Sequence, residues 1–146
     1  MSVSRITRVL IVEDFDPFRR FIRSTLAKRS KLQIVGEASD GLAAVLKAEA
    51  LRPDLVTLDL GLPTLNGIEA ARRIRKVSPD CAMLFVSQES SREVVEEALS
   101  TGAAGYVEKT RAASDLLAAV DAVLNGGQFV SEGLSDQETL RTTKHA

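Results

Sequence analysis

The sequence contains one cysteine, one histidine and no tryptophan among its 146 residues. Cys81 has no partner for an intramolecular disulfide, which favours a reducing compartment. The only histidine is His145, next to the C-terminal residue, so a zinc cluster is excluded for want of ligands. No apolar run approaches the roughly 20 residues of a membrane span, and the first residues lack the apolar stretch of a signal peptide. We therefore expect a cytoplasmic protein without a membrane segment.

An excess of charge of one sign is also missing. The chain carries 19 Lys and Arg against 20 Asp and Glu, a net charge of −1. A general nucleic-acid or membrane-surface binder would need surplus positive charge. We therefore expect neither partner to bind this chain directly. Apolar residues make up 45% of the sequence, and both this share and the length suit one globular domain.

Five short apolar runs recur along the chain, at residues 8–12, 32–36, 55–58, 82–86 and 103–107. Several are apolar almost throughout, which is typical of strands covered on both faces. The segments between them place apolar residues every three or four positions, as in Phe18, Phe21, Ile22 and Leu26, which indicates amphipathic helices. The alternation predicts an α/β fold of the (βα)5 type, a doubly wound, five-stranded parallel sheet of flavodoxin-like architecture.

Local signals place the ends of some of these elements. Asp16 before Pro17 indicates a helix N-cap followed by a first-turn proline, and Ser90 with Glu93 fits a capping box. The periodic pattern stops near residue 127. We therefore expect one domain over residues 1–127 and a tail, or the start of a linker, over residues 128–146.

Polar residues follow every predicted strand, and those after the second, from Glu37 to Asp40, resemble an ordinary loop into a helix. Glu13 and Asp14 end the first, Asp59 the third, Ser87 the fourth and Lys109 the fifth. In open parallel sheets, ligands bind at the carboxyl ends of the strands. Three carboxylates gathered there would repel one another unless a cation lies among them. Carboxylate ligands without imidazole or thiolate favour Mg²⁺ or Mn²⁺.

A hydroxyl and a lysine at the same edge would complete a site for a phosphoryl group. Asp59 is the only nucleophile among them, and carboxylates form acyl phosphates. Taken singly, each residue has a simpler explanation: the acidic pair as a solvated loop, Asp59 as turn chemistry, Lys109 as a surface charge. Their occurrence in order at successive strand ends favours a common site.

These motifs resemble the receiver domain of bacterial response regulators in two-component signalling. The matching stretches are Val-Leu-Ile-Val-Glu-Asp at 9–14, Leu-Asp-Leu-Gly-Leu-Pro at 58–63 running on to Asn-Gly at 66–67, Phe-Val-Ser at 85–87, and Gly-Ala-Ala-Gly-Tyr-Val-Glu-Lys at 102–109. Within the family, the Gly-Ala-Ala-Gly-Tyr run and the segment 126–131 are most similar to receivers of the LuxR/NarL type.

The resemblance implies a role for each residue at the predicted edge. Asp59 would accept a phosphoryl group from the phosphohistidine of a sensor histidine kinase or a phosphotransfer protein. Asp14, Asp59 and the backbone carbonyl of Gly61 would ligate Mg²⁺ (or Mn²⁺), with Glu13 acting mainly through water. Lys109 would pair with a phosphoryl oxygen.

The resemblance also implies a switch. Ser87 would bind another phosphoryl oxygen and move on phosphorylation, and Tyr106 would rotate inward, changing the surface formed by the fourth helix and fifth strand. From the residues alone, packing at the sheet edge is an equally good role for Tyr106. A homodimer is compatible with the family, and nucleic acid would be reached only through an output domain that these residues do not contain. We expect a free-standing receiver or part of a longer regulator.

Two other classes of function were weighed against this one. A phosphatase of the haloacid-dehalogenase kind needs a second aspartate two residues after the nucleophile, where this chain has Gly61. A flavin binder needs a Ser/Thr/Gly-rich loop after the first strand, where this chain has Glu13 and Asp14. We therefore expect no enzyme activity beyond the chain's own phosphorylation and dephosphorylation.

Overall fold

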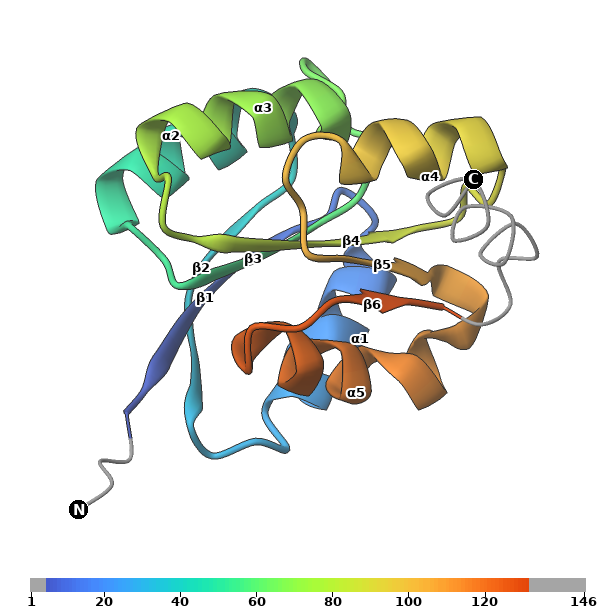
Figure 1. Cartoon of the computed structure of the whole chain (residues 1–146). Helices are drawn as coiled ribbons and strands as arrows, with labels where there is room; N and C mark the ends of the chain where they lie inside the picture. The colour runs from blue at the N-terminus through green and yellow to red at the C-terminus, as the bar shows by residue number, and fades with distance from the viewer. Residues whose placement is uncertain (1–4, 132–146) are drawn as a thin grey trace.

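The computed structural model describes residues 5–131, which form one parallel sheet with helices on both faces (Figure 1). The strand order is β2-β1-β3-β4-β5-β6, and every neighbouring pair is parallel. The strands are β1 (Thr7–Val12), β2 (Leu32–Ala38), β3 (Leu55–Leu58), β4 (Ala82–Ser87), β5 (Gly105–Glu108) and β6 (Phe129–Val130). The chain adds β2 on one side of β1 and then adds β3 to β6 in succession on the other side, so the strand order reverses at β1.

Five α-helices connect the strands, as the periodic pattern predicts. They are α1 (Asp16–Leu26), α2 (Gly41–Leu51), α3 (Gly67–Val77), α4 (Arg92–Leu99) and α5 (Ala112–Leu124), with a short 3₁₀ turn η1 (Lys109–Arg111) before α5. Figure 1 shows α2, α3 and α4 along one face of the sheet and α1 with α5 along the other. The doubly wound α/β fold is confirmed. No helix within residues 5–131 has both the length and the apolar character needed to span a membrane.

The strands are apolar almost throughout because both faces of the sheet are covered. Alternate side chains of one strand enter two separate apolar clusters. Leu10 and Val56 pack toward α2, α3 and α4, whereas Val9 and Leu55 pack toward α1 and α5. Each cluster removes large side chains from water, and this burial is the main favourable contribution to folding.

The sheet has one strand more than the sequence predicts. Residues Phe129–Val130 pair with Gly105 and Tyr106 of β5, so the first residues of the expected tail lie in the sheet. Two residues are too few to display the alternation that reveals a strand, and main-chain hydrogen bonds decide their position. The N–H of Phe129 donates to Ala104 over 3.2 Å and that of Ser131 donates to Tyr106 over 2.9 Å. The rest of the expected tail, and His145, lie outside the described residues.

Two predicted helix starts are displaced by one residue. The N-cap of α1 is Phe15 rather than Asp16, and Asp16 is the first helical residue. The N-cap of α4 is Ser91, whose hydroxyl oxygen accepts from the N–H of Val94 over 3.3 Å, rather than Ser90. At α4, the adjacent Ser90 and Ser91 offer the same capping chemistry, so the local pattern cannot choose between them. At α1, Phe15 makes no side-chain capping hydrogen bond, and the pattern of capping residues does not indicate it.

Candidate functional site

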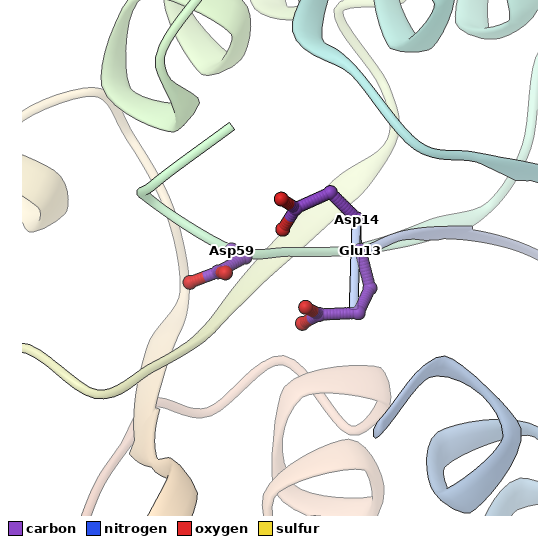
Figure 2. A group of neighbouring side chains, drawn as sticks. All are labelled: Glu13, Asp14 and Asp59. Carbon is purple, nitrogen blue, oxygen red and sulfur yellow. The ribbon is translucent and has the colours of Figure 1, made fainter. Parts of the chain in front are cut away.

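The site lies where β1 and β3 end side by side. Val12 pairs with Leu58 in the parallel ladder, and the N–H of Asp59 donates to the carbonyl of Val12 over 3.2 Å. The residues that follow each strand therefore meet at one edge of the sheet. Figure 2 shows the carboxylates of Glu13 and Asp14, from the end of β1, extending toward Asp59. The ligand oxygens of these three residues lie within 4.8 Å of one another.

Lys109 reaches this acidic cluster from the end of β5. Its Nζ lies 3.0 Å from Oε1 of Glu13 and 3.2 Å from Oδ2 of Asp59. The side chains of Glu13 and Asp59 are 1% and 10% exposed, so the ammonium group offsets two carboxylates that are almost completely removed from water. The ring of Phe18, from α1, lies under the same Nζ at 4.7 Å and adds a cation–π contact.

The charge of this cluster is only partly balanced. Burial raises the pKa of Glu13, the hydrogen bond from Lys109 lowers it, and the negative charge of Asp59 raises it further. The N–H of Phe15 donates to Oε2 of Glu13 over 3.1 Å. The buried Oε1 of Glu13 forms an ion pair with Lys109 Nζ over 3.0 Å but makes no hydrogen bond within residues 5–131.

These features fit a hard divalent cation. The donor set consists of carboxylate oxygens, which Mg²⁺ and Mn²⁺ prefer. One of those oxygens is buried and without a hydrogen-bond partner among the described residues. A cation near the cluster would also reduce the repulsion between Glu13, Asp14 and Asp59.

The cluster opens into a cavity of about 550 Å³. Asp14, Gly61, Ser87 and Lys109 line it, so the structure brings every residue of the predicted site to one hollow, apart from the buried Tyr106 beside it. The cavity continues past the carboxylates between α3 and α4. Among the residues that line it, the ammonium group of Lys109 and the hydroxyl of Ser87 can both donate to a small anion.

A chain of hydrogen bonds joins Ser87 to Tyr106. The N–H of Glu89 donates to Oγ of Ser87 over 3.2 Å, and the carbonyl of Glu89 accepts from the hydroxyl of Tyr106 over 2.7 Å. Ser87 is 2% exposed and Tyr106 is completely buried. The structure therefore holds Tyr106 in the inward position, where its ring packs beside that of Phe85 at 6.1 Å between centroids.

Tyr106 gives a direct optical test of this arrangement, because the chain has no other tyrosine and no tryptophan. Burial raises the pKa of the Tyr106 hydroxyl to about 12. The phenolate absorbance of the folded protein should therefore titrate near this value and that of the urea-unfolded chain near about 10. Since the unfolded state releases the proton first, the free energy of unfolding should fall as the pH rises above about 10. A folded-state midpoint near about 10 would contradict the buried position.

Two contributors to the site were not foreseen from the sequence. The spacing of Phe18 places it on the apolar face of a helix, and nothing in that spacing indicates its contact with a lysine more than 90 residues away. The main chain of Glu89 links Ser87 to Tyr106, and main-chain hydrogen bonds leave no mark on residue type. Both contacts depend on how α1 and the β4–α4 loop lie over the sheet edge.

The doubly wound sheet and the acidic cluster beside a lysine define a class of signalling domain. The sequence pattern of the response regulator receiver domain matches residues 9–121. The chain belongs to this family: it is a receiver domain of the response regulators of two-component systems.

Within the family its relatives include regulators of the LuxR/NarL type. The chain is 33% identical over 135 residues to the response regulator GacA of Pseudomonas viridiflava, which covers 92% of this chain and 63% of the relative. It is also 33% identical to the nitrate/nitrite response regulator protein NarL of Escherichia coli K12, over 92% of this chain and 62% of NarL. The chain thus spans less than two thirds of both relatives.

A solved structure agrees with this placement. The two-component response regulator of the LuxR family from Aurantimonas sp. SI85-9A1 superimposes with a TM-score of 0.87 at 28% identity. The match covers 94% of this chain and 99% of that one. The doubly wound α/β fold predicted from the alternation of strands and helices is therefore shared with a solved receiver structure.

Proposed function

We propose that Asp59 is the phosphoacceptor of this receiver domain and that Lys109 and Ser87 bind the transferred phosphoryl group. The observation that carries the proposal is the position of Lys109 Nζ, 3.2 Å from Oδ2 of Asp59 at the carboxylate cluster. A positive charge fixed beside a nucleophilic carboxylate stabilises the charge that develops on a phosphoryl group in transfer.

The transfer itself is a displacement at phosphorus. A carboxylate oxygen of Asp59 forms a P–O bond while the P–N bond to the donor histidine breaks, and the imidazole leaves with the bonding electron pair. Lys109 then shifts its hydrogen bond from Asp59 to a phosphoryl oxygen. Hydrolysis of the acyl phosphate by water returns Asp59 and releases inorganic phosphate. The chain turns over no other substrate in this proposal.

Asp14, Asp59 and the carbonyl of Gly61 are the proposed ligands of Mg²⁺ or Mn²⁺, with Glu13 acting mainly through water. When bound, the ion would supply positive charge that, together with Lys109, would neutralise the phosphoryl oxygens. Glu13 also orients Lys109, through its contacts of 3.0 and 3.1 Å with the ammonium group.

The proposed switch uses the hydrogen bonds that start at Ser87. A phosphoryl oxygen on Asp59 offers the Ser87 hydroxyl a stronger, charged acceptor. Movement of Ser87 toward this oxygen would change its hydrogen bond with the N–H of Glu89, which is 3.2 Å long in the present structure. Because the carbonyl of Glu89 holds the hydroxyl of Tyr106, the change reaches the surface formed by α4 and β5.

The proposed partners follow from this chemistry. The phosphodonor is a sensor histidine kinase or a phosphotransfer protein, and α1 beside the cavity is the proposed docking element. We further propose that a homodimer forms on activation and that transcription is controlled through an output domain. Cytoplasmic localisation is part of the same proposal.

Phosphorylation by acetyl phosphate tests the assignment of Asp59. With Mg²⁺ present, the intact mass of the wild-type chain should rise by one phosphoryl group, and the increase should require the metal. Asp59→Asn keeps the shape of the side chain but removes the nucleophile, so its mass should stay unchanged.

Asp54→Asn is the matched control, because Asp54 precedes β3 at the opposite edge of the sheet. It should be phosphorylated as the wild type is. Equal phosphorylation of Asp59→Asn would reject Asp59 as the acceptor, and turnover of a phosphate ester by the wild type would instead favour a phosphatase.

A further inference from the structure

Ser131 is a completely buried residue that directly follows β6. Its N–H donates to the carbonyl of Tyr106 over 2.9 Å. Its hydroxyl lies 3.1 Å from the main-chain nitrogen of Glu108 and 2.8 Å from Oδ2 of Asp115. This one residue therefore contacts β5 twice and α5 once.

The directions of these hydrogen bonds are determined by the groups involved. The N–H of Glu108 can only donate, so Oγ of Ser131 accepts there, and its single proton goes to the carboxylate of Asp115. Asp115 lies in the first turn of α5 and is 8% exposed. We call the hydrogen-bonded pair Ser131 and Asp115 the clasp. Without the Ser131 hydroxyl, the N–H of Glu108 would lose its acceptor.

The two residues of the clasp contact both ends of the turn that carries Lys109, η1. Glu108, held by Ser131, directly precedes this turn. At its other end, Nε of Arg111 lies 3.3 Å from Oδ2 of Asp115. Asp115 therefore restrains both ends of the three-residue turn, directly at Arg111 and through Ser131 at Glu108.

The position of that turn decides where the ammonium group of Lys109 lies. Its Nζ must stay within reach of Asp59, 3.2 Å away, and then of a phosphoryl oxygen. A displacement of the turn would misalign a charge that has to be in place before the transfer begins, and small errors of this kind slow reactions markedly. Apolar packing alone would leave the turn free to shift, since η1 has no buried residue.

We propose that Ser131 and Asp115 are positioning residues for Lys109 and that the clasp couples phosphorylation of Asp59 to the end of β6. The inference rests on the proposed function of Asp59. Coupling between two sites is reciprocal. Movement of Lys109 toward a phosphoryl group therefore changes the strength of the hydrogen bonds that Ser131 makes. Conversely, weakening those hydrogen bonds changes the rate of phosphoryl transfer to Asp59.

The test compares phosphorylation rates of full-length variants with acetyl phosphate and saturating Mg²⁺. Ser131→Ala removes the hydroxyl and should lower the rate constant about 10-fold while leaving the affinity for Mg²⁺ unchanged. Ser131→Thr restores the hydroxyl and should recover most of the rate. A purely structural role would lower the thermal stability of Ser131→Ala but leave its phosphorylation rate, measured well below the melting temperature, as in the wild type.

Ser78→Ala is the matched control, because Ser78 is also buried, 3% exposed, but caps the end of α3 at the opposite edge of the sheet. It should be phosphorylated at the wild-type rate. If Ser131→Ala does not fold, the phosphorylation rate of Asp115→Asn is measured instead. The amide oxygen of the introduced asparagine can still accept from the hydroxyl of Ser131, but the ion pair with Arg111 is lost. The Asp115→Asn substitution should also lower the phosphorylation rate constant.

Hydrogen exchange at the amide of Ser131 supplies a second readout. Beryllofluoride with Mg²⁺, used as a phosphoryl mimic, should change this exchange rate in the wild type and not in Ser131→Ala. If the wild type is phosphorylated but Ser131→Ala is phosphorylated at the same rate, the clasp is wrong and the proposed function stands. The same conclusion follows if beryllofluoride leaves the hydrogen exchange at Ser131 unchanged. A wild type that accepts no phosphoryl group overturns the proposed function and the clasp together.

Discussion

Gly67→Ala should lower the free energy of unfolding by about 3 kcal/mol. Gly67 is the first residue of α3 and lies directly against the end of β3. A Cβ there would overlap the carbonyl oxygen of Asp59 and lie 2.7 Å from Cα of Leu60. Both neighbours are main-chain atoms, so no flexible side chain can move aside. The helix must shift outward, and the N–H of Gly67 would lose its 2.7 Å hydrogen bond to Leu60.

Gly61→Ala is the control for this substitution. Gly61 lies in the same β3–α3 connection, but no atom is within 4 Å of a Cβ built there, and its φ is outside the left-handed region. Its stability should change by less than about 0.5 kcal/mol. Urea denaturation of both variants in the absence of divalent ions measures the difference. Equal stability of the two variants would show that α3 can move away from β3 at little cost.

Lys109→Met should lower the free energy of unfolding by about 3 kcal/mol in the absence of Mg²⁺. The substitution keeps the length and the apolar stem of the side chain but removes the cation that balances Glu13 and Asp59. These carboxylates would then be buried without their positive partner. Because the cluster becomes more negative, Mg²⁺ should bind the variant more tightly and stabilise it by more than it stabilises the wild type.

Arg29→Met is the control for the loss of a cation. Arg29 forms an ion pair of 2.7 Å with Asp121, shorter than either contact of Lys109, but both side chains are nearly half exposed. Exposed pairs contribute little, because water solvates the separated charges. Urea denaturation in EDTA and in excess Mg²⁺ should therefore affect Lys109→Met strongly and Arg29→Met weakly. If Mg²⁺ raises the free energy of unfolding of the wild type and of Lys109→Met equally, Lys109 does not balance the charges of Glu13 and Asp59.

Gly67 and Lys109 explain different parts of the same site. Gly67 lets the main chain of α3 approach β3, which fixes the peptide group of Asp59. Lys109 supplies the charge that allows Glu13 and Asp59 to be buried together. A stable arrangement of like charges thus depends on one close backbone contact and on the two ion pairs of one lysine.

The alternation of elements and the identity of the strand-end residues were predictable from the sequence. Strands covered on both faces must be apolar throughout, and helices covering them must repeat every three or four residues. In a doubly wound sheet these constraints place the ends of β1 and β3 together. Glu13, Asp14 and Asp59 could therefore be placed at one edge without coordinates.

Other features depend on contacts between residues far apart in the chain. The two-residue strand β6 has no periodicity to detect, and its pairing with β5 is decided by main-chain hydrogen bonds. The cation–π contact of Phe18 with Lys109 and the hydrogen bond of Ser131 with Asp115 join residues of ordinary type whose spacing carries no signal. Residue pattern records whether a position is buried and with what period, and so it determined the sheet, the helices and the acidic edge. Which distant group a buried polar atom meets depends on the packing of whole elements, and only the tertiary structure decided it.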